Sequence, residues 1–380
     1  DYNGTMTLSE KIAALESRTG INRPVKQLRS LMQQYIPETL KIPAIQVAGT
    51  NGKGSTVTWM SLLADRPVIG TFTSPHMFSH FERMTINNQP IPADQWEAIY
   101  DRWLPLFEEQ DFTMFEADLW MAMVWFAEKD VDLMLMETGL GGERDATTAL
   151  DYLATGITNI GRDHMQYLGS TLEEIAKAKA GIFKPGIPAL TAEQDPALFE
   201  ILSREAAQAG TLLTRAPAIS LSKDFPKYQE ANLGLAAELL TAANIPVKPL
   251  EQAEKNFFWP GRMQIVSQDP LQVVDGAHNP EGIEALCRSL PGVDRIFFSV
   301  LADKQAPEMI RRLLETGKAV TLVRFDTRRL ADLEELSAQF GLDLVSLEEA
   351  LSSDKPALYC GSLKFAAAVL KGKHYDKHEF

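Results

Sequence analysis

The feature that most constrains this chain is the segment IQVAGTNGKGSTVTWMS, residues 45–61. An apolar run over residues 42–48 leads directly into a glycine-rich turn, and residues that favour a helix follow it. The turn consists of Gly49, Thr50, Asn51, Gly52, Lys53, Gly54, Ser55 and Thr56. Glycines let successive N–H groups converge on phosphate oxygens, a helix N-terminus adds partial positive charge, and Lys53 supplies a mobile cation. The order of strand, turn and helix start therefore predicts a phosphate-binding loop.

The match to the strict phosphate-loop pattern is incomplete. That pattern has Ser or Thr directly after the lysine, where this chain has Gly54, and a glycine at the position of Val47. A glycine-rich turn with a solvated lysine remains the alternative. The dense grouping of Gly, Lys and Ser in GTNGKGS favours phosphate binding.

Composition limits the classes of protein and partner. A chain of 380 residues is long enough for two domains with separate cores. Its net charge of −14 argues against non-specific binding of nucleic acid or of anionic membranes. The two cysteines, Cys287 and Cys360, are too few for a disulfide framework or a zinc site, which favours a reducing, cytoplasmic location. The sequence contains no apolar run of transmembrane length.

Strand-type and helix-type segments alternate along the first two thirds of the chain. The expected strands are residues 42–48, 68–73, 131–137, 152–158 and 186–191, and the expected helices are residues 8–18, 24–35, 94–108, 114–129, 171–179 and 232–243. Polar residues follow directly after several of these strands. This alternation predicts a mostly parallel α/β sheet, in which ligands bind at the carboxyl ends of the strands.

A turn signal, Pro260-Gly261 within FFWPGR, interrupts the alternation at residues 257–262. Beyond it, strands are expected at residues 271–274, 295–300, 319–325 and 357–359, with helices between them. The predicted fold class is therefore α/β, with an N-terminal P-loop ATPase domain over residues 1–260 and a smaller C-terminal Rossmann-like domain over residues 261–380.

Three strand ends carry residues suited to a metal. Glu137 ends an otherwise apolar strand, and a buried carboxylate needs a partner or a cation. Ser74 and His164 follow two other strands, so all three residues are expected at the edge where the phosphate loop lies. Oxygen ligands with one imidazole suit Mg²⁺ bound to phosphates. The alternatives are a carboxylate solvated at the sheet rim and a structural histidine.

With these motifs in place, the chain resembles the folylpolyglutamate synthase/dihydrofolate synthase family of Mur-ligase-like, ATP-dependent amide ligases. The resemblance rests on GTNGKGS, TSPH, the E-x-GLGG stretch that starts at Glu137, and Asp163-His164, and it extends from about residue 28 to residue 363. It implies ATP as a substrate and two Mg²⁺ sites. The residues it implies as metal ligands are Ser55, Ser74, Glu137, His164 and Lys179, and Lys53, Glu137, His164 and Lys179 are implied as catalytic.

The role of Lys179 comes from the resemblance alone. In the segment KAKAGIFKPG, the family pattern points to Lys179 as a lysine carbamylated by CO₂, which would make it an anionic ligand for the second Mg²⁺. Lysines at such spacing are otherwise typical of a solvated helix face.

The resemblance also implies contacts to nucleotide and acceptor. Arg262, Asp275 and His278 would contact the nucleotide from the second domain, and Asn232 would lie near the adenine. Asp275 and His278 are equally consistent with helix capping. Arg83 in FERM and Asp145 in GGERDAT fall where the family handles its pterin-glutamate substrate, although either also fits a surface ion pair.

The favoured function is an ATP-dependent ligase that joins a folate carboxylate, of dihydropteroate or a folyl-glutamate, to L-glutamate through an acyl phosphate. Carboxylate and amine do not condense in water, so phosphate must become the leaving group. The alternatives are a Mur-type ligase for another carboxylate acceptor and a nucleotide-binding regulatory protein derived from a ligase. The expected partners are these small molecules, with no nucleic acid or membrane, and the expected state is a monomer.

Overall fold

The computed structural model describes residues 6–222, 225–290 and 292–373, and within these the chain forms two compact units. The first unit runs as far as Ile160 and also contains His164–Ile219 and Ala231–Phe257. The second contains Phe258 onward and two short internal segments, Gly161–Asp163 and Ser220–Glu230. Among the described helices, none combines the length and the apolarity needed to cross a bilayer.

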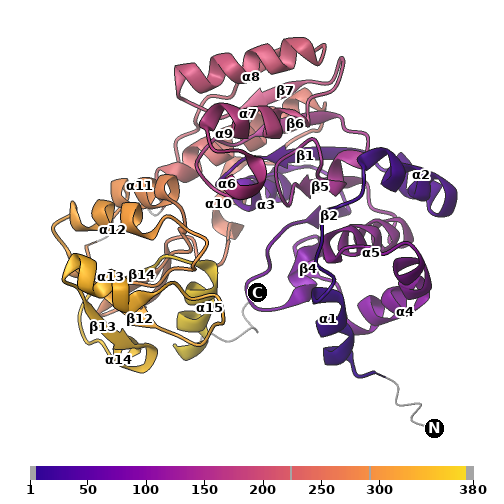
Figure 1. Ribbon diagram of the computed structural model, residues 1–380. Coiled ribbons are helices and arrows are strands. Elements are labelled where there is room, and N and C mark those ends of the chain that lie inside the picture. Colours follow the sequence, from indigo (N-terminus) through magenta and orange to yellow (C-terminus); the bar gives the residue numbers. More distant parts are fainter. Residues whose placement is uncertain (1–5, 223–224, 291, 374–380) are drawn as a thin grey trace, which may run out of the picture. The chain divides into compact units, whose positions relative to one another are not determined.

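Within the described residues, the first unit is built on an eight-stranded sheet with the order β4-β3-β2-β5-β1-β6-β7-β8 (Figure 1). Its strands are β1 (Ala44–Ala48), β2 (Ile69–Phe72), β3 (Met84–Ile86), β4 (Gln89–Pro90), β5 (Leu133–Glu137), β6 (Ala154–Ile157), β7 (Ala189–Thr191) and β8 (Leu213–Arg215). All neighbours from β2 to β8 pair in parallel, whereas β3 and β4 pair antiparallel at one edge. Every residue of β1, β2, β5 and β6 is buried, as expected for parallel strands covered on both faces.

The helices of the first unit cover this sheet. They are α1 (Leu8–Glu16), α2 (Val25–Tyr35), α3 (Lys53–Leu63), α4 (Ala93–Glu109), α5 (Met114–Glu128), α6 (Met165–Leu168), α7 (Leu172–Ala180), α8 (Pro196–Gln208), α9 (Tyr228–Ala242) and α10 (Leu250–Asn256), with 3₁₀ turns η1 (Pro37–Lys41), η2 (His80–Arg83) and η3 (Ala146–Ala149). The first residues of α9 belong to the second unit. Helix α5 is buried along most of its length and is capped by Thr113 and Glu116. Its large side chains form one core with those of α4, including Trp96, Tyr100, Trp120 and Phe126.

The second unit has, in its described part, a six-stranded sheet with the order β13-β12-β11-β14-β10-β9. Its strands are β9 (Gln264–Gln268), β10 (Leu271–Val274), β11 (Arg295–Phe298), β12 (Ala319–Arg324), β13 (Asp343–Ser346) and β14 (Ala357–Cys360), and its helices are α11 (Pro280–Arg288), α12 (Ala306–Leu314), α13 (Leu333–Phe340), α14 (Leu347–Leu351) and α15 (Leu363–Gly372). All pairs are parallel except β9 with β10. The predicted fold class, a P-loop domain with a mostly parallel sheet followed by a smaller Rossmann-like domain, is confirmed.

The sequence pattern did not indicate the antiparallel strands β3, β4 and β9, nor the parallel edge strands β8 and β13. Strands β3 and β4 have three and two residues, too few to show a period of two. The turn between them is made by Asn87 and Asn88, both with positive φ, as in the two-residue turns of tight hairpins. Asparagine tolerates that conformation better than most residues, so this pair was the available signal.

Candidate active site

The phosphate loop needs glycine at two positions, Gly49 and Gly52. Gly49 has a φ of 141°, and a Cβ placed there would lie 1.8 Å from Oγ1 of Thr158. Gly52 precedes α3 with a φ of 83°, and its Cβ would lie 2.3 Å from Oδ1 of Asn232. Both positions therefore combine a left-handed backbone with neighbours that leave no room for a side chain. Asn232, expected near the adenine, lies against this loop.

Hydrogen bonds to Asn159, which the sequence did not indicate, fix the backbone of the loop. The backbone N–H of Asn51 donates to Oδ1 of Asn159 at 2.9 Å, and Nδ2 of Asn159 donates to the Asn51 carbonyl at 3.2 Å. The N–H of Thr50 donates to the Asn159 carbonyl at 3.0 Å. Asn159 comes just after β6, the neighbour of β1, so the sheet fixes the shape of the loop. A polar residue directly after a strand was the available signal.

The structure brings Lys53, Glu137 and Ser74 together at the ends of neighbouring strands. Lys53 Nζ lies 3.9 Å from Glu137 Oε1 and donates to the carbonyls of Gly49 at 3.1 Å and Thr50 at 3.3 Å. The Ser74 backbone N–H donates to Glu137 Oε2 at 3.2 Å. Because β2, β5 and β1 are adjacent and parallel, the residues that follow them meet at one edge. Glu137 is 4% exposed, so it is a buried carboxylate with a cation beside it.

Lys179 lies in the same group and is buried, not on a solvated face. It is 5% exposed and its Nζ donates to the Gly49 carbonyl at 3.0 Å. Lys53 and Lys179 therefore bind the same carbonyl of the phosphate loop. A Cβ on Gly142 would lie 2.5 Å from the Lys179 carbonyl, so the GLGG segment packs closely on the end of α7.

His164 and Ser55 are the remaining residues expected as metal ligands. His164 precedes α6 with a φ of 51° and is exposed, on the segment that follows β6. Ser55 is buried in the first turn of α3. The strand order β2-β5-β1-β6 thus aligns the segments that carry Ser74, Glu137, the phosphate loop and His164.

The donor set fits a divalent cation at Glu137. A carboxylate and serine hydroxyls are the hard oxygen ligands that Mg²⁺ prefers, and they lie beside the loop that would hold phosphates. Lys179 in its unmodified form does not fit as a ligand, because an ammonium group only donates hydrogen bonds.

Arg83 lies in a buried network with His76 and Asp118. Its Nε donates to His76 Nδ1 at 2.9 Å and its Nη1 lies 3.4 Å from Asp118 Oδ2. Burial, together with the nearby Arg83 charge, lowers the pKa of His76 to about 4, so this ring is neutral at pH 7. Burial also disfavours the charged form of His80, but the hydrogen bond that its ring donates to Asp118, the charge of that carboxylate and the hydrogen bond to Glu16 together outweigh burial, and the pKa of His80 is raised.

Asp145 has both carboxylate oxygens engaged within its own loop. Oδ2 accepts from the N–H groups of Gly139 at 2.8 Å and Leu140 at 3.0 Å, and Oδ1 accepts from the N–H and hydroxyl of Thr147. Burial raises the pKa of this carboxyl group. These contacts make Asp145 the organiser of the segment that follows Glu137.

We expect Asp145→Ala to lower the free energy of unfolding by about 3 kcal/mol or more, because it leaves three backbone N–H groups around a buried side chain without their acceptor. Urea denaturation of the full chain measures this loss. Asp151→Ala is the matched control, since Asp151 pairs with Arg29 at the surface and its loss should cost about 1 kcal/mol or less. Equal losses for the two variants would contradict the role given to Asp145.

In the second unit, Asp275 and His278 form internal contacts. Asp275 is buried and accepts from the N–H groups of Met263 and Ala277, at 2.9 and 2.8 Å, and from the Tyr228 hydroxyl at 3.2 Å. Burial raises its pKa, although the Arg262 charge acts in the opposite direction. His278 Nδ1 lies 2.8 Å from the Gly276 carbonyl.

A second set of contacts in that unit gathers around Asp163. Its carboxylate lies 2.6 Å from Lys304 Nζ, 3.3 Å from His278 Nε2 and 3.2 Å from Asn279 Nδ2. The preceding Arg162 pairs with Glu281 and Glu308. The residues just before His164 are therefore fixed to the second unit.

Comparison with known proteins places this geometry in a family. The Mur ligase middle domain matches residues 47–215, and the Mur ligase glutamate ligase domain matches residues 261–366. The dihydrofolate synthase/folylpolyglutamate synthase of Bacillus subtilis is 33% identical over 93% of this chain and 95% of its own.

Solved structures agree. The Mycobacterium tuberculosis folylpolyglutamate synthase complexed with ADP has a TM-score of 0.87 and 25% identity over 97% of this chain and 98% of its own. The Escherichia coli FolC complex with DHPP and ADP has a TM-score of 0.85 and 25% identity over 98% of both chains. The resemblance read from the motifs is thus confirmed, and this chain belongs to the dihydrofolate synthase/folylpolyglutamate synthase family of Mur ligases, which are ATP-dependent ligases.

Proposed function

We propose that this ligase forms an amide between a folate carboxylate, of dihydropteroate or a folyl-glutamate, and the amine of L-glutamate, with ATP converted to ADP and phosphate. One observation carries the proposal: four adjacent parallel strands, β2, β5, β1 and β6, end at one edge with Ser74, Glu137, the phosphate loop and the segment of His164. This arrangement puts a buried carboxylate that suits a divalent cation beside a loop that suits phosphates, which supports phosphoryl transfer from a nucleotide.

The proposed reaction has two steps, formation of an acyl phosphate and attack on it by the amine. A carboxylate oxygen of the acceptor attacks the γ-phosphorus of ATP and ADP leaves, which gives an acyl phosphate. The glutamate amine then attacks the acyl carbon, the C–O bond to phosphate breaks, and the amine proton is released. Lys53 and the loop N–H groups from Gly52 to Ser55 would hold and neutralise the phosphates during the first step, whereas the Thr56 N–H donates to the Gly52 carbonyl.

The roles of the remaining residues are part of the proposal. Ser55, Ser74, Glu137 and His164 would hold Mg²⁺, which supplies positive charge at the transferred phosphate. Asn232 would lie near the adenine, and Arg262 would contribute a permanent cation toward phosphate, with His278 beside it. The carboxylate oxygens of Asp275 already accept from the N–H groups of Met263 and Ala277. Asp275 would therefore act indirectly, by positioning the backbone next to Arg262.

On the acceptor side, Arg83 is the better supported of the two expected residues. It is 6% exposed and carries a cation into a buried network, where an anionic acceptor would find a partner. Asp145 would act through the shape of the segment that it organises. We further propose that Lys179 reacts with CO₂ to a carbamate, with release of protons, and then holds a second Mg²⁺.

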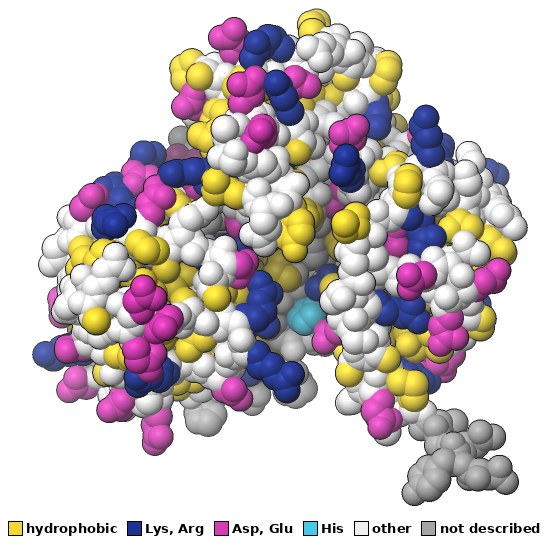
Figure 2. Space-filling model, in the orientation of Figure 1, with side chains coloured by type: hydrophobic (Ala, Val, Ile, Leu, Met, Phe, Trp, Pro, Cys, Tyr) yellow, Lys and Arg dark blue, Asp and Glu magenta, His cyan; other side chains and the backbone are white. Residues whose placement is uncertain are grey.

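We also propose a cytoplasmic monomer without nucleic-acid or membrane partners. The net charge of −14 disfavours both partners, and the free Cys287 and Cys360 suit a reducing compartment. On the face shown in Figure 2, acidic and basic side chains are interspersed, without one large basic field. Sedimentation analysis of the purified chain tests the monomer.

The acyl-phosphate route predicts a specific isotope transfer. With ¹⁸O in both oxygens of the acceptor carboxylate, we expect one label in the released phosphate and the other in the amide, measured by mass spectrometry. Label-free phosphate would exclude this route, and label in AMP would indicate adenylation. As the test of substrate class, ADP release should require both L-glutamate and a pteroate or folate, and no ADP with any such pair would contradict the proposed acceptor.

A further inference from the structure

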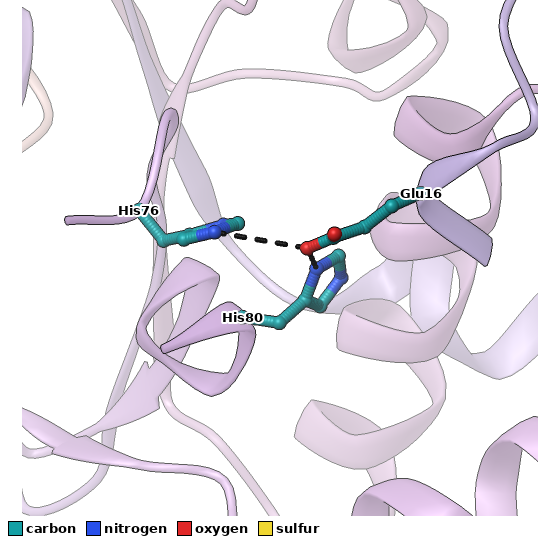
Figure 3. Close-up of side chains that lie close together, drawn as sticks. All are labelled: Glu16, His76 and His80. Atoms are coloured by element: carbon teal, nitrogen blue, oxygen red, sulfur yellow. Dashed lines mark hydrogen bonds and ion pairs between the residues drawn. The ribbon is translucent and has the colours of Figure 1, made fainter. Parts of the chain in front are cut away.

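Three side chains that can ligate a metal lie together between the end of α1 and the loop after β2. Figure 3 shows the Glu16 carboxylate pointing between the imidazole rings of His76 and His80. Glu16 Oε1 lies 3.0 Å from His80 Nδ1 and 3.7 Å from His76 Nε2. The ligand atoms that these three residues offer all lie within 4.8 Å of one another. We propose that Glu16, His76 and His80 form a binding site for one divalent cation of the zinc class.

The spacing of the group matches such a site. Ligand atoms about 2.0–2.1 Å from a tetrahedral zinc ion are separated by about 3.3–3.4 Å, and the two distances from Glu16 bracket this value. Two imidazole nitrogens with one carboxylate oxygen favour Zn²⁺ or Co²⁺ over Mg²⁺, which prefers oxygen ligands. Three protein ligands leave a position for solvent, as in open zinc sites.

The surroundings of His80 add an independent observation. Its other ring nitrogen, Nε2, lies 2.7 Å from Oδ1 of Asp118, a fully buried carboxylate on α5. A carboxylate that accepts the second N–H is the usual device by which proteins orient a ligating histidine. It directs Nδ1 of His80 toward Glu16. Glu16 is the most exposed member of the group, so a cation has access from solvent.

The hydrogen bond from Arg83 to His76 competes with binding of a cation at His76. Because Arg83 Nε donates to His76 Nδ1, the proton of the neutral His76 ring lies on Nε2. A cation on Nε2 replaces that proton, and the ring then carries its proton on Nδ1, facing the Arg83 N–H. Occupation of the site and the hydrogen bond from Arg83 to His76 therefore exclude each other.

Occupation would also connect separate parts of the first unit. Glu16 ends α1, His76 follows β2 and His80 begins η2. A cation would thus join the N-terminal helix to the loop that carries Ser74. The chain with Zn²⁺ should therefore unfold at a higher temperature than the chain without it.

The test is Zn²⁺ titration by calorimetry and Co²⁺ titration by visible absorption, on the full chain with excess Mg²⁺ to fill the oxygen-rich site. A parent with His374→Asn and His378→Asn removes two other histidines. We expect one equivalent bound, and at least tenfold weaker binding in Glu16→Gln and in His76→Asn. Glu38→Gln, an exposed carboxylate on η1, and Glu137→Gln should bind Zn²⁺ like the parent.

These variants leave the buried His80–Asp118 pair intact, so folding, checked by circular dichroism, should be retained. Arg83→Met should bind Zn²⁺ more tightly than the parent, because it removes the competing donor. No binding by the parent, or parent-like affinity in both Glu16→Gln and His76→Asn, would overturn the site. Equal or weaker binding by Arg83→Met would overturn the assignment of His76 Nε2 as a ligand.

Discussion

Replacing Glu137 with glutamine is expected to lower kcat by about 100-fold or more, whereas the affinity for nucleotide should change much less. The amide keeps the size of the side chain and an oxygen that can accept from the Ser74 N–H. It loses the negative charge that lies 3.9 Å from Lys53 and is proposed to hold a divalent cation. Because the charge on the γ-phosphate changes most during transfer, the loss should fall on turnover.

Steady-state and single-turnover measurements of ADP release separate these effects. Lys53→Ala is a useful comparison, since Lys53 is proposed to contact the phosphates directly and its loss should weaken both nucleotide binding and turnover. Glu143→Gln is the matched control, because Glu143 is an exposed carboxylate in the segment after Glu137 and should leave kcat near normal. A kcat for Glu137→Gln within a fewfold of the parent would contradict the proposed role.

The sequence predicts the strand ends well because the pattern there is local. An apolar run that ends in a polar residue, such as LMLME, identifies β5 and its end at Glu137 without knowledge of the fold. In a parallel sheet these ends share one edge, so the grouping of Lys53, Glu137 and Ser74 follows from topology. Burial of Lys179 does not follow, since its spacing also fits a solvated helix face.

Local sequence patterns do not predict contacts between residues that lie far apart in the sequence. His76 and His80 are visible as a pair, but Glu16 and Asp118 lie far from them in the sequence and meet them only in the fold. Asp145 and Asp275 show a second limit. A sequence identifies a buried aspartate after a strand, but not whether its oxygens face a ligand or, as here, accept from nearby backbone N–H groups.

Lys179→Ala is expected to abolish most turnover. Two chemical forms of the lysine, an ammonium group and a carbamate, would each explain this loss, and experiment can distinguish them. As an ammonium group, Lys179 donates to the Gly49 carbonyl and supports the phosphate loop. As a carbamate, it would instead present oxygens to a second cation. Both forms predict a large loss, because the side chain is buried against the loop.

The two forms differ in what restores activity. A carbamate requires CO₂, so activity of the parent should fall when CO₂ is removed and recover with bicarbonate, and acetate should partly restore Lys179→Ala by supplying oxygen ligands. An ammonium group requires neither, so parent activity would not depend on CO₂ and acetate would have no effect. Lys177→Ala is the matched control on the same helix, since Lys177 pairs with Glu173 at the surface and its loss should leave kcat near normal. Near-normal turnover of Lys179→Ala would show that Lys179 has no part in the reaction in either form, even though its Nζ lies 3.0 Å from the Gly49 carbonyl of the phosphate loop.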